Sequence, residues 1–309
     1  MLWLALELNL LSFLPIILST NQIQETEARV KYILTQALGS SLLMVRRLSM
    51  YIQTTSTNVI IFILIIAIII KIGLAPCHIW YPSVISSIAW SSALILTSWQ
   101  KIAPLSIIIF ILIKSSSWII TLLARINALI GGLIGINQSQ LRTILAYSSI
   151  THLGWITGLI SINKPLLAIR YFLIYVIVVS PIFIILNIIN VKTLTQINKG
   201  IKPWSILSII LPLLLLSLGG LPPLLGFIPK LITIYSITYL PLTIILILGA
   251  VINLYYYLNI TFSTILRTNK NNFNITSSNI NYLITIPRIA ALLIIPIIII
   301  YALTILNKS

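Results

Sequence analysis

Four ionisable side chains lie within apolar stretches of this sequence: Glu7, Lys71, Lys101 and Lys230. An ionised group near the centre of a bilayer costs about 2.5–3.5 kcal/mol on insertion scales, so by default it marks a functional position. Carboxylate and ammonium groups exchange protons. Proton transfer is therefore the chemistry that these residue types predict.

Two of the lysines stand beside a glycine–proline interruption of an apolar segment. Lys71 is followed by Gly73–Pro76, and Lys230 follows Gly219–Pro223. Glycine and proline free backbone groups that lipid cannot satisfy, so such a break persists only when it is buried in protein or lines a water-filled cavity. A pair of broken membrane helices, one in each half of a chain, predicts an ion or substrate path.

The assignments of Lys101 and Lys230 also depend on how deep each lysine lies in its segment. Lys101 lies near the middle of its apolar segment, too deep for its side chain to reach either interface comfortably. Lys230 could instead anchor its segment at an interface, but the apolar run that follows it favours the interior. Both are predicted to take part in proton translocation.

The acidic residues are Glu7, Glu25 and Glu27, and the sequence has no aspartate. Glu7 could lie at the interface or inside the membrane, and a buried carboxylate needs a counter-charge to remain ionised. We predict an ion pair between Glu7 and Lys71 whose strength sets the proton affinity of the lysine. Glu25 and Glu27 precede an apolar run and are interpreted as first-turn acids that favour the helix dipole.

The two histidines are supporting candidates for proton transfer. His78 follows the first break, and His152 lies in a polar part of its apolar segment. A single helical histidine is more often a structural hydrogen-bond donor than a proton carrier. The hydroxyls of Tyr147, Ser148 and Thr151 could order water beside His152, and this keeps it among the candidates.

The composition identifies an integral membrane protein. Of 309 residues, 59% are hydrophobic and 7% are charged, and the mean hydropathy is +1.12. A soluble domain has about 25% charged residues. Apolar stretches of about 20 residues favour helices over a barrel, whose strands alternate. The net charge of +16 is spread singly along the chain, so we expect no nucleic-acid partner.

No pattern in the sequence predicts a metal or a redox cofactor. The one cysteine, Cys77, excludes an internal disulfide. We find no cysteine cluster, no spaced histidine ligands and no dinucleotide-binding fingerprint. We therefore expect this chain to hold neither a metal nor a cofactor.

The apolar runs predict an all-α integral membrane protein with one polytopic domain, residues 1–309. The breaks fall in the third and the eighth of about ten expected transmembrane helices. We therefore predict two five-helix repeats, 2–136 and 143–306, which are inverted because five is odd. Lys71 precedes its break and Lys230 follows its own, an order that we attribute to the inversion. The expected helices lie at about 2–19, 28–48, 57–81, 85–112, 116–136, 143–161, 165–191, 203–237, 241–265 and 284–306.

Loop charge predicts how the bundle is oriented. The loops after odd-numbered segments hold more basic residues than the others, and the positive-inside bias places them in the inner compartment. Both termini are then expected on the outer side. The basic residues of the inner set are Arg142, Lys192, Lys199, Lys202, Arg267 and Lys270.

A series of short motifs resembles the chain-2 family of mitochondrial NADH–ubiquinone oxidoreductase, which is respiratory complex I. The resemblance runs in order over about residues 3–265 and is weak beyond them. The motifs that carry it lie at Leu6–Leu11, Thr26–Gln36, Lys71–Pro76, Thr97–Pro104, Ile136–Arg142, Ala146–Trp155 and Gly219–Lys230.

The resemblance implies an antiporter-like, proton-translocating membrane-arm subunit of the mitochondrial inner membrane. Glu7, Lys71, Lys101 and Lys230 match the family's membrane glutamate and lysines. FMN, iron–sulfur clusters and ubiquinone are then expected in other subunits, so this chain is a subunit of a translocating NADH:ubiquinone reductase without its own redox centre. The implied partners are neighbouring membrane-arm subunits and lipids such as cardiolipin, with both termini in the intermembrane space.

The chain departs from the family pattern in three places. It begins where the family usually has a preceding helix, so one helix is expected to be missing. The family's Pro-Phe-His-Phe-Trp reads Pro76-Cys77-His78-Ile79-Trp80 here. Arg29, Arg46 and Arg47 are unusual for the family and are expected to shorten the second helix.

Two other classes of function stay open at this point. A stand-alone cation/proton antiporter needs the same lysines, and sodium transport by the isolated protein would distinguish it. A structural subunit that no longer pumps would agree with a missing helix. The presence of Glu7 and of all three lysines argues against that second alternative.

Overall fold

The computed structural model describes residues 2–17, 23–52, 57–112, 117–194, 196 and 206–268. Within these ranges the regular structure is helical, apart from one isolated bridge between Gln140 and Thr193. The predicted all-α class is therefore confirmed. The helix expected at 284–306 lies outside the described residues, so the count of ten stays a prediction.

The helices follow the apolar runs of the sequence. In the described part of the chain, four stretches are long and apolar enough to cross a bilayer: Trp90–Ile109, Trp118–Ile136, Pro165–Ile189 and Leu240–Thr264. In chain order the helices are α1 (Leu2–Ile17), α2 (Ile23–Ile52), α3 (Thr57–Ile72), α4 (Trp80–Ser87), α5 (Trp90–Thr97), α6 (Trp99–Leu112), α7 (Ser117–Ile136), α8 (Leu141–Ser161), α9 (Pro165–Ile189), α11 (Ile206–Gly219), α12 (Phe227–Ser236) and α13 (Leu240–Thr268). All backbone hydrogen bonds of a helix lie within the helix, which suits a segment surrounded by lipid.

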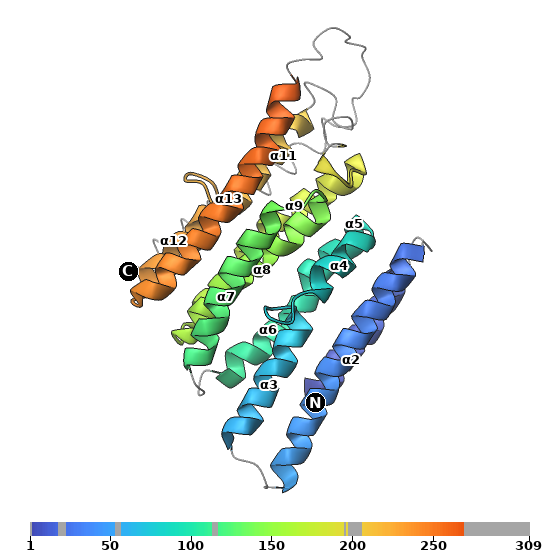
Figure 1. The fold of residues 1–309 in the computed structure, drawn as a ribbon, viewed down its shortest axis with the longest axis vertical. Helices are drawn as coiled ribbons and strands as arrows, with labels where there is room; N and C mark the ends of the chain where they lie inside the picture. Colours follow the sequence, from blue (N-terminus) through green and yellow to red (C-terminus); the bar gives the residue numbers. More distant parts are fainter. Residues whose placement is uncertain are drawn as a thin grey trace.

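The long helices lie side by side, with α2 and α3 at one edge of the bundle and α12 and α13 at the opposite edge (Figure 1). The short helices α4 and α5 join the two sides, because α4 packs against both α2 and α8 while α5 packs against α9. On the far side, α7 packs against α8 and α13. Each broken segment therefore packs against a continuous helix: α3 and α4 against α2, and α11 and α12 against α9.

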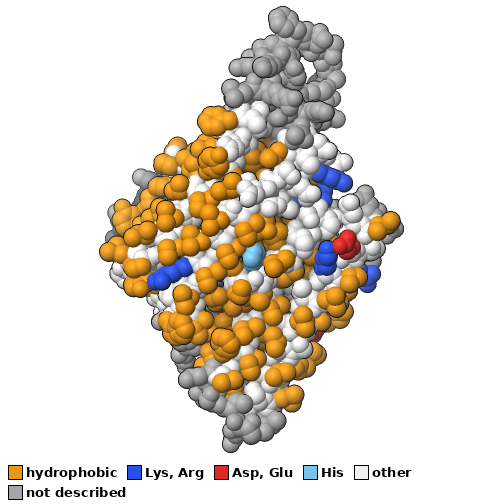
Figure 2. All heavy atoms as spheres, viewed as in Figure 1, with side chains coloured by type: hydrophobic (Ala, Val, Ile, Leu, Met, Phe, Trp, Pro, Cys, Tyr) orange, Lys and Arg blue, Asp and Glu red, His pale blue; other side chains and the backbone are white. Residues whose placement is uncertain are grey.

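The outer surface is apolar. Figure 2 shows hydrophobic side chains over most of one face, with few charged side chains between them. Large apolar residues of α2 and α13 are more than half exposed, among them Leu34, Leu38, Leu248 and Val251. A surface of this kind fits a lipid environment, because a soluble protein rarely exposes so extended an apolar area.

The fourth helix, expected at 85–112, begins later than predicted and is interrupted within its length. The helix that follows the first break, α4, runs on to Ser87, and the next segment begins only at Trp90 and is interrupted at Ser98. The Ser98 hydroxyl donates a hydrogen bond to the Leu94 carbonyl at 2.7 Å. Such a bond from a serine to the carbonyl four residues earlier bends a helix. Lys101 therefore lies in the first turn of α6, directly after an interruption.

The expectation of a shortened second helix is also wrong, since α2 spans 30 residues. Arg29, Arg46 and Arg47 all lie within it. Arginine is a good helix former, and its long side chain can carry the charge away from apolar surroundings. These arginines therefore change the surface of α2 and not its length.

Candidate functional site

The first break is satisfied by groups of the protein itself. Gly73 follows the last residue of α3 with φ +78°, a left-handed conformation that glycine adopts without strain. The Leu74 N–H donates to the Ile69 carbonyl at 3.1 Å. The Ala75 N–H donates to Asn127 Oδ1 at 2.7 Å, and Asn127 is fully buried on α7. Gly73, Leu74 and Ala75 are thus buried in protein, as predicted, while Pro76 is exposed.

The second break has the same form of cap. Gly220 has φ +85°, and the Leu221 N–H donates to the Leu216 carbonyl at 3.3 Å. Here the freed carbonyl of Gly219 accepts a hydrogen bond from Lys230 Nζ at 2.6 Å. Lys230 is 5% exposed, so it is buried at the break and does not anchor the segment at an interface.

Lys71 is buried in the last turn of α3, where the helix dipole favours a cation. Its stem packs closely on α2, because a Cβ on Gly39 would lie 2.7 Å from Lys71 Cγ. The predicted ion pair with Glu7 is not formed, since the two side chains do not approach within 4.0 Å. Glu7 is partly exposed on α1 and acts on the lysine only electrostatically. Lys71 itself borders a small cavity.

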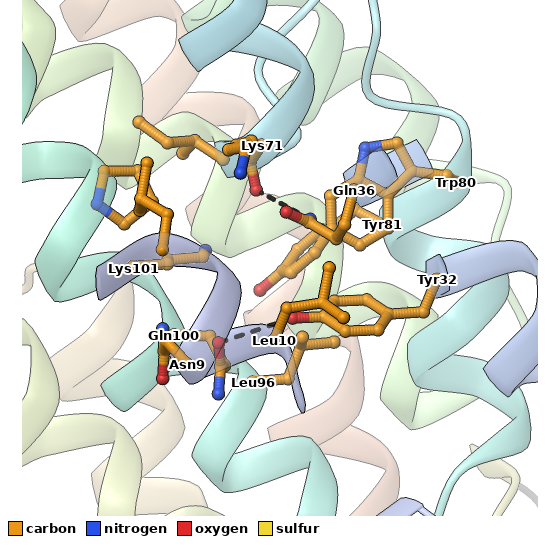
Figure 3. Close-up of a pocket in the computed structure, with 13 residues that line it drawn as sticks. Asn9, Leu10, Tyr32, Gln36, Lys71, Trp80, Tyr81, Leu96, Gln100 and Lys101 are labelled. Atoms are coloured by element: carbon orange, nitrogen blue, oxygen red, sulfur yellow. Dashed lines mark hydrogen bonds between the residues drawn. The ribbon is translucent and has the colours of Figure 1, made fainter. Parts of the chain in front are cut away.

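That cavity lies between Lys71 and Lys101 (Figure 3). Its volume is about 20 Å³, which is enough for one water molecule. Polar groups of Tyr32, Gln36 and Gln100 also line it, and the Tyr32 hydroxyl donates to Gln100 Oε1 at 3.3 Å. A water in this position would have polar partners on several sides and would join the two lysines.

Lys101 is 2% exposed and has two defined contacts. Its ammonium lies 4.3 Å from the centre of the Tyr81 ring, a cation–π arrangement, and donates to Ser149 Oγ at 3.1 Å. The Ser149 hydroxyl in turn lies 2.8 Å from the Tyr81 oxygen. Tyr175 on α9 also interacts with Ser149. Lys101 is therefore joined through one serine to two buried tyrosines.

His152 continues this set of contacts toward the second break. Its Nδ1 lies 2.9 Å from the Tyr171 hydroxyl, and its ring centre lies 5.1 Å from that of Tyr175. Both Lys101 and Lys230 act electrostatically on the imidazole. Its Nε2 is buried without a hydrogen-bond partner of good geometry among the described residues. His152 is thus within electrostatic reach of both lysines.

The hydroxyls expected beside His152 have other positions. The Tyr147 ring lies against His78, and the Ser148 hydroxyl donates to the Leu145 carbonyl. Thr151 accepts a hydrogen bond from Asn253. The groups that do flank His152 are tyrosines of α9, which no local sequence pattern indicates. His78 Nδ1 lies 3.2 Å from the Pro76 carbonyl oxygen. Among the described residues, His78 makes no hydrogen bond to a buried lysine.

Two charged residues are buried to a degree that the sequence did not indicate. Arg142 is not a loop residue but lies buried in the first turn of α8, where it donates to the Ser86 and Ile88 carbonyls and stacks over Trp90. Glu25 is 2% exposed and interacts electrostatically with Arg142. Burial in the bundle, rather than the helix dipole alone, therefore accounts for Glu25.

Glu27 lies beyond the first turn of α2, so the predicted first-turn position is confirmed for Glu25 and wrong for Glu27. It forms an ion pair with Lys31 at 2.5 Å, and the side chains of the two residues are 65% and 47% exposed. The two lie one helical turn apart on α2, where such pairs are favourable by about 0.2–0.5 kcal/mol. Nothing in this pair calls for a functional role.

Comparison with known proteins identifies the class. The family model described as NADH:quinone oxidoreductase/Mrp antiporter, transmembrane, matches residues 1–255. The chain therefore belongs to this family of antiporter-like membrane subunits. Among its relatives, NADH-ubiquinone oxidoreductase chain 2 of Lumbricus terrestris is 48% identical over 266 residues, which cover 85% of this chain and 79% of the relative.

Solved structures agree on the fold. A chain of the membrane-bound sulfane sulfur reductase, an archaeal respiratory membrane complex, matches with a TM-score of 0.84 and 18% identity, over 99% of this chain and 69% of the other. A chain of respiratory complex I from Thermus thermophilus matches with a TM-score of 0.75 and 22% identity, over 85% of this chain and 64% of the other. The chain thus spans about two thirds of these structural relatives.

Proposed function

We propose that this chain is chain 2 of an NADH–ubiquinone oxidoreductase, the name that its relatives carry. In that complex it acts as a proton-translocating membrane subunit. Family membership and 48% identity to the earthworm relative support the assignment. Moving one proton against a potential of ~180 mV costs about 4 kcal/mol. We assign the redox centres, and with them the energy source, to neighbouring subunits of the same complex.

The observation that carries the proposal is the arrangement of three buried lysines along one set of polar contacts. Lys71 and Lys101 share the small cavity, and Lys101 leads through Ser149 toward His152. His152 interacts electrostatically with Lys230, whose ammonium donates to the Gly219 carbonyl at the second break. Buried ionisable residues that face the interior of a bundle mark a proton or ion path. We therefore assign the transfer route to these five residues.

We also propose that the chain is built from two inverted repeats. In the first half α2 packs against α3 and α4, and in the second half α9 packs against α11 and α12. The two breaks share one form of cap, which supports the correspondence. Two repeats of inverted topology are still matched residue by residue in the same N-to-C order. Gly73 then aligns with Gly220, and Lys71 aligns with Leu218. The order of Lys71 and Lys230 around their breaks therefore does not follow from inversion.

The route predicts the effect of removing one hydroxyl. Ser149→Ala deletes the group that joins Lys101 to Tyr81 and Tyr175, and we expect NADH-driven proton pumping to fall about five-fold, the kinetic equivalent of losing one hydrogen bond. Pumping is measured in vesicles with the assembled complex. Ser161→Ala is the matched control, since Ser161 is buried on the same helix and bonds the Gly158 carbonyl. Equal rates for both variants would contradict the route.

Glu7 is expected to act on Lys71 through its electric field. Glu7→Gln should lower pumping, and the effect should shrink in a Lys71→Met background, with an interaction energy of about 0.5 kcal/mol or more in the double-mutant cycle. Pumping rates of the two single variants and the double variant measure this energy. Glu27→Gln serves as the control, because Glu27 pairs with Lys31 on the surface. Strictly additive effects of Glu7 and Lys71 would show that the two do not communicate.

The remaining assignments follow from the proposed function. We place the chain in the mitochondrial inner membrane as a multi-pass protein, with both termini toward the intermembrane space. Its partners are the neighbouring antiporter-like subunits of the membrane arm and lipids such as cardiolipin, and FMN, iron–sulfur clusters and ubiquinone belong to other subunits. Labelling of the termini in intact mitoplasts tests the orientation.

A further inference from the structure

Arg125 is a charged residue within a membrane-spanning segment that the proton route does not use. It lies on α7, about two helical turns after Trp118, where the candidate span Trp118–Ile136 begins. Its side chain is partly buried, and its Nε has no hydrogen-bond partner of good geometry among the described residues. No carboxylate of these residues lies within 4.0 Å of the guanidinium. A cation at this depth is costly unless an anion or a polar group accompanies it.

The acidic side chains of this chain do not provide the counter-charge. The whole sequence has three of them, Glu7, Glu25 and Glu27, and all lie on α1 and α2. Helix α1 packs against α2, which forms the edge of the bundle opposite α13 (Figure 1). On the face shown in Figure 2, the side of α13 carries basic and hydrophobic side chains but no acidic ones. The anion that balances Arg125 must therefore belong to another molecule.

A second cation is directed at the same short connection between α12 and α13. The Arg125 guanidinium carbon lies 5.2 Å from the centre of the Tyr239 ring, a cation–π arrangement. The Lys164 ammonium donates to the Ser236 carbonyl at 3.0 Å, and Lys164 is exposed. Three residues of chain span at most about 11 Å, so the two points of contact are close together. Two basic groups, one from α7 and one from the turn before α9, therefore lie at one connection.

The surroundings of these two cations are those of a membrane interface. Trp118 and Leu122 lie on the same face of α7 as Arg125, and they are 63% and 40% exposed. Tyr235 and Tyr239 are 83% and 51% exposed. Tryptophan and tyrosine are enriched where a membrane protein meets the lipid headgroups. An occupant of this place needs a negative charge at one end and an apolar body beside α7.

We propose that Arg125, Lys164 and Tyr239 form a binding site for the headgroup of an anionic phospholipid. The guanidinium donates to phosphate oxygens while its face stays on the Tyr239 ring, and Lys164 adds a second positive charge. The acyl chains then lie along the apolar face of α7. The inference rests on the proposed function only for the leaflet, since the proposed orientation places the Lys164 turn, and with it this lipid, on the intermembrane-space side.

Photolabelling of the assembled complex tests the site. The complex is placed in phosphatidylcholine vesicles that contain a trace of photoreactive cardiolipin, and the labelled peptides are identified after irradiation. We expect label on the peptides that hold Arg125 and Tyr239, and about ten-fold less of it in the double variant Arg125→Gln/Lys164→Gln. The control is Lys31→Gln/Arg47→Gln, which removes two exposed basic groups from α2 and should leave this label unchanged.

Three results would overturn the lipid site. Equal labelling by photoreactive phosphatidylcholine would show that the site has no preference for an anionic headgroup. Loss of the label on addition of inorganic phosphate would make it a site for the free anion. A crosslink from α7 to an acidic segment of another subunit, in place of lipid, would make it a protein interface.

Two single variants keep the test valid if the double variant does not assemble. Lys164→Gln changes an exposed residue and should lower the label about three-fold, whereas Arg125→Lys keeps the charge and should retain most of it. An unchanged label in Lys164→Gln, with full loss in Arg125→Lys, would contradict recognition by charge. Pumping does not enter these results, so their failure leaves the lysine route standing, and failure of the route leaves the lipid site standing.

Discussion

Lys101→Ala is expected to lower NADH-driven proton pumping and quinone reduction together, by about ten-fold or more. Lys101 connects both parts of the proposed route, since it borders the small cavity with Lys71 and donates to Ser149. Its removal breaks the path at the middle, and a barrier increase of 1.36 kcal/mol already corresponds to a ten-fold loss in rate. Because electron transfer and pumping are coupled, both rates should fall. Proton release and quinone reduction are measured in the same vesicles.

A control lysine separates this effect from a general loss of charge. Lys31→Ala removes an exposed side chain that pairs with Glu27 on the surface of α2, an interaction worth about 0–1 kcal/mol. We expect its pumping to match that of the unmodified complex. The amount of assembled complex is measured for both variants. An unchanged rate and an unchanged ratio of protons to electrons in Lys101→Ala would make Lys101 a structural anchor.

Gly220→Ala is expected to have the second-largest effect, because Gly220 shapes the second break. Its φ of +85° costs an L-residue about 1–2 kcal/mol. A Cβ at this position would lie 2.8 Å from both Cδ and Nζ of Lys230. The lysine end is flexible and can move away, so the chain should still fold, but the ammonium would leave the Gly219 carbonyl. We therefore expect pumping to fall about ten-fold, with a smaller loss of assembled complex.

Gly158→Ala provides the comparison for this variant. Gly158 is buried on α8, and the nearest atom to an added Cβ is the Leu246 Cδ1 at 3.3 Å, the end of a side chain that can adjust. We expect near-normal assembly and pumping. Both are measured on the same preparations as for Gly220→Ala. If Gly220→Ala pumps as well as Gly158→Ala, the position of the Lys230 ammonium at the break has no role in transfer.

The sequence by itself determined the class of protein, the places of the two breaks and the three lysines. These features are local. An apolar run long enough to cross a bilayer, or a lysine within it, carries its energetic meaning whatever the neighbouring helices are. The same is true of glycine and proline, which end a helix through their own backbone properties. For this reason the sequence predicts Lys71, Lys101 and Lys230 as interior lysines, and all three are buried in the structure.

Only the tertiary structure decided which groups meet at these positions. Asn127 satisfies the Ala75 amide from 52 residues away, and Ser149 meets Tyr81 over 68 residues. Such pairs depend on how each helix is rotated and how it crosses its neighbours, and local sequence patterns do not encode either. The same rotation and crossing keep the Glu7 carboxylate from pairing with the Lys71 ammonium.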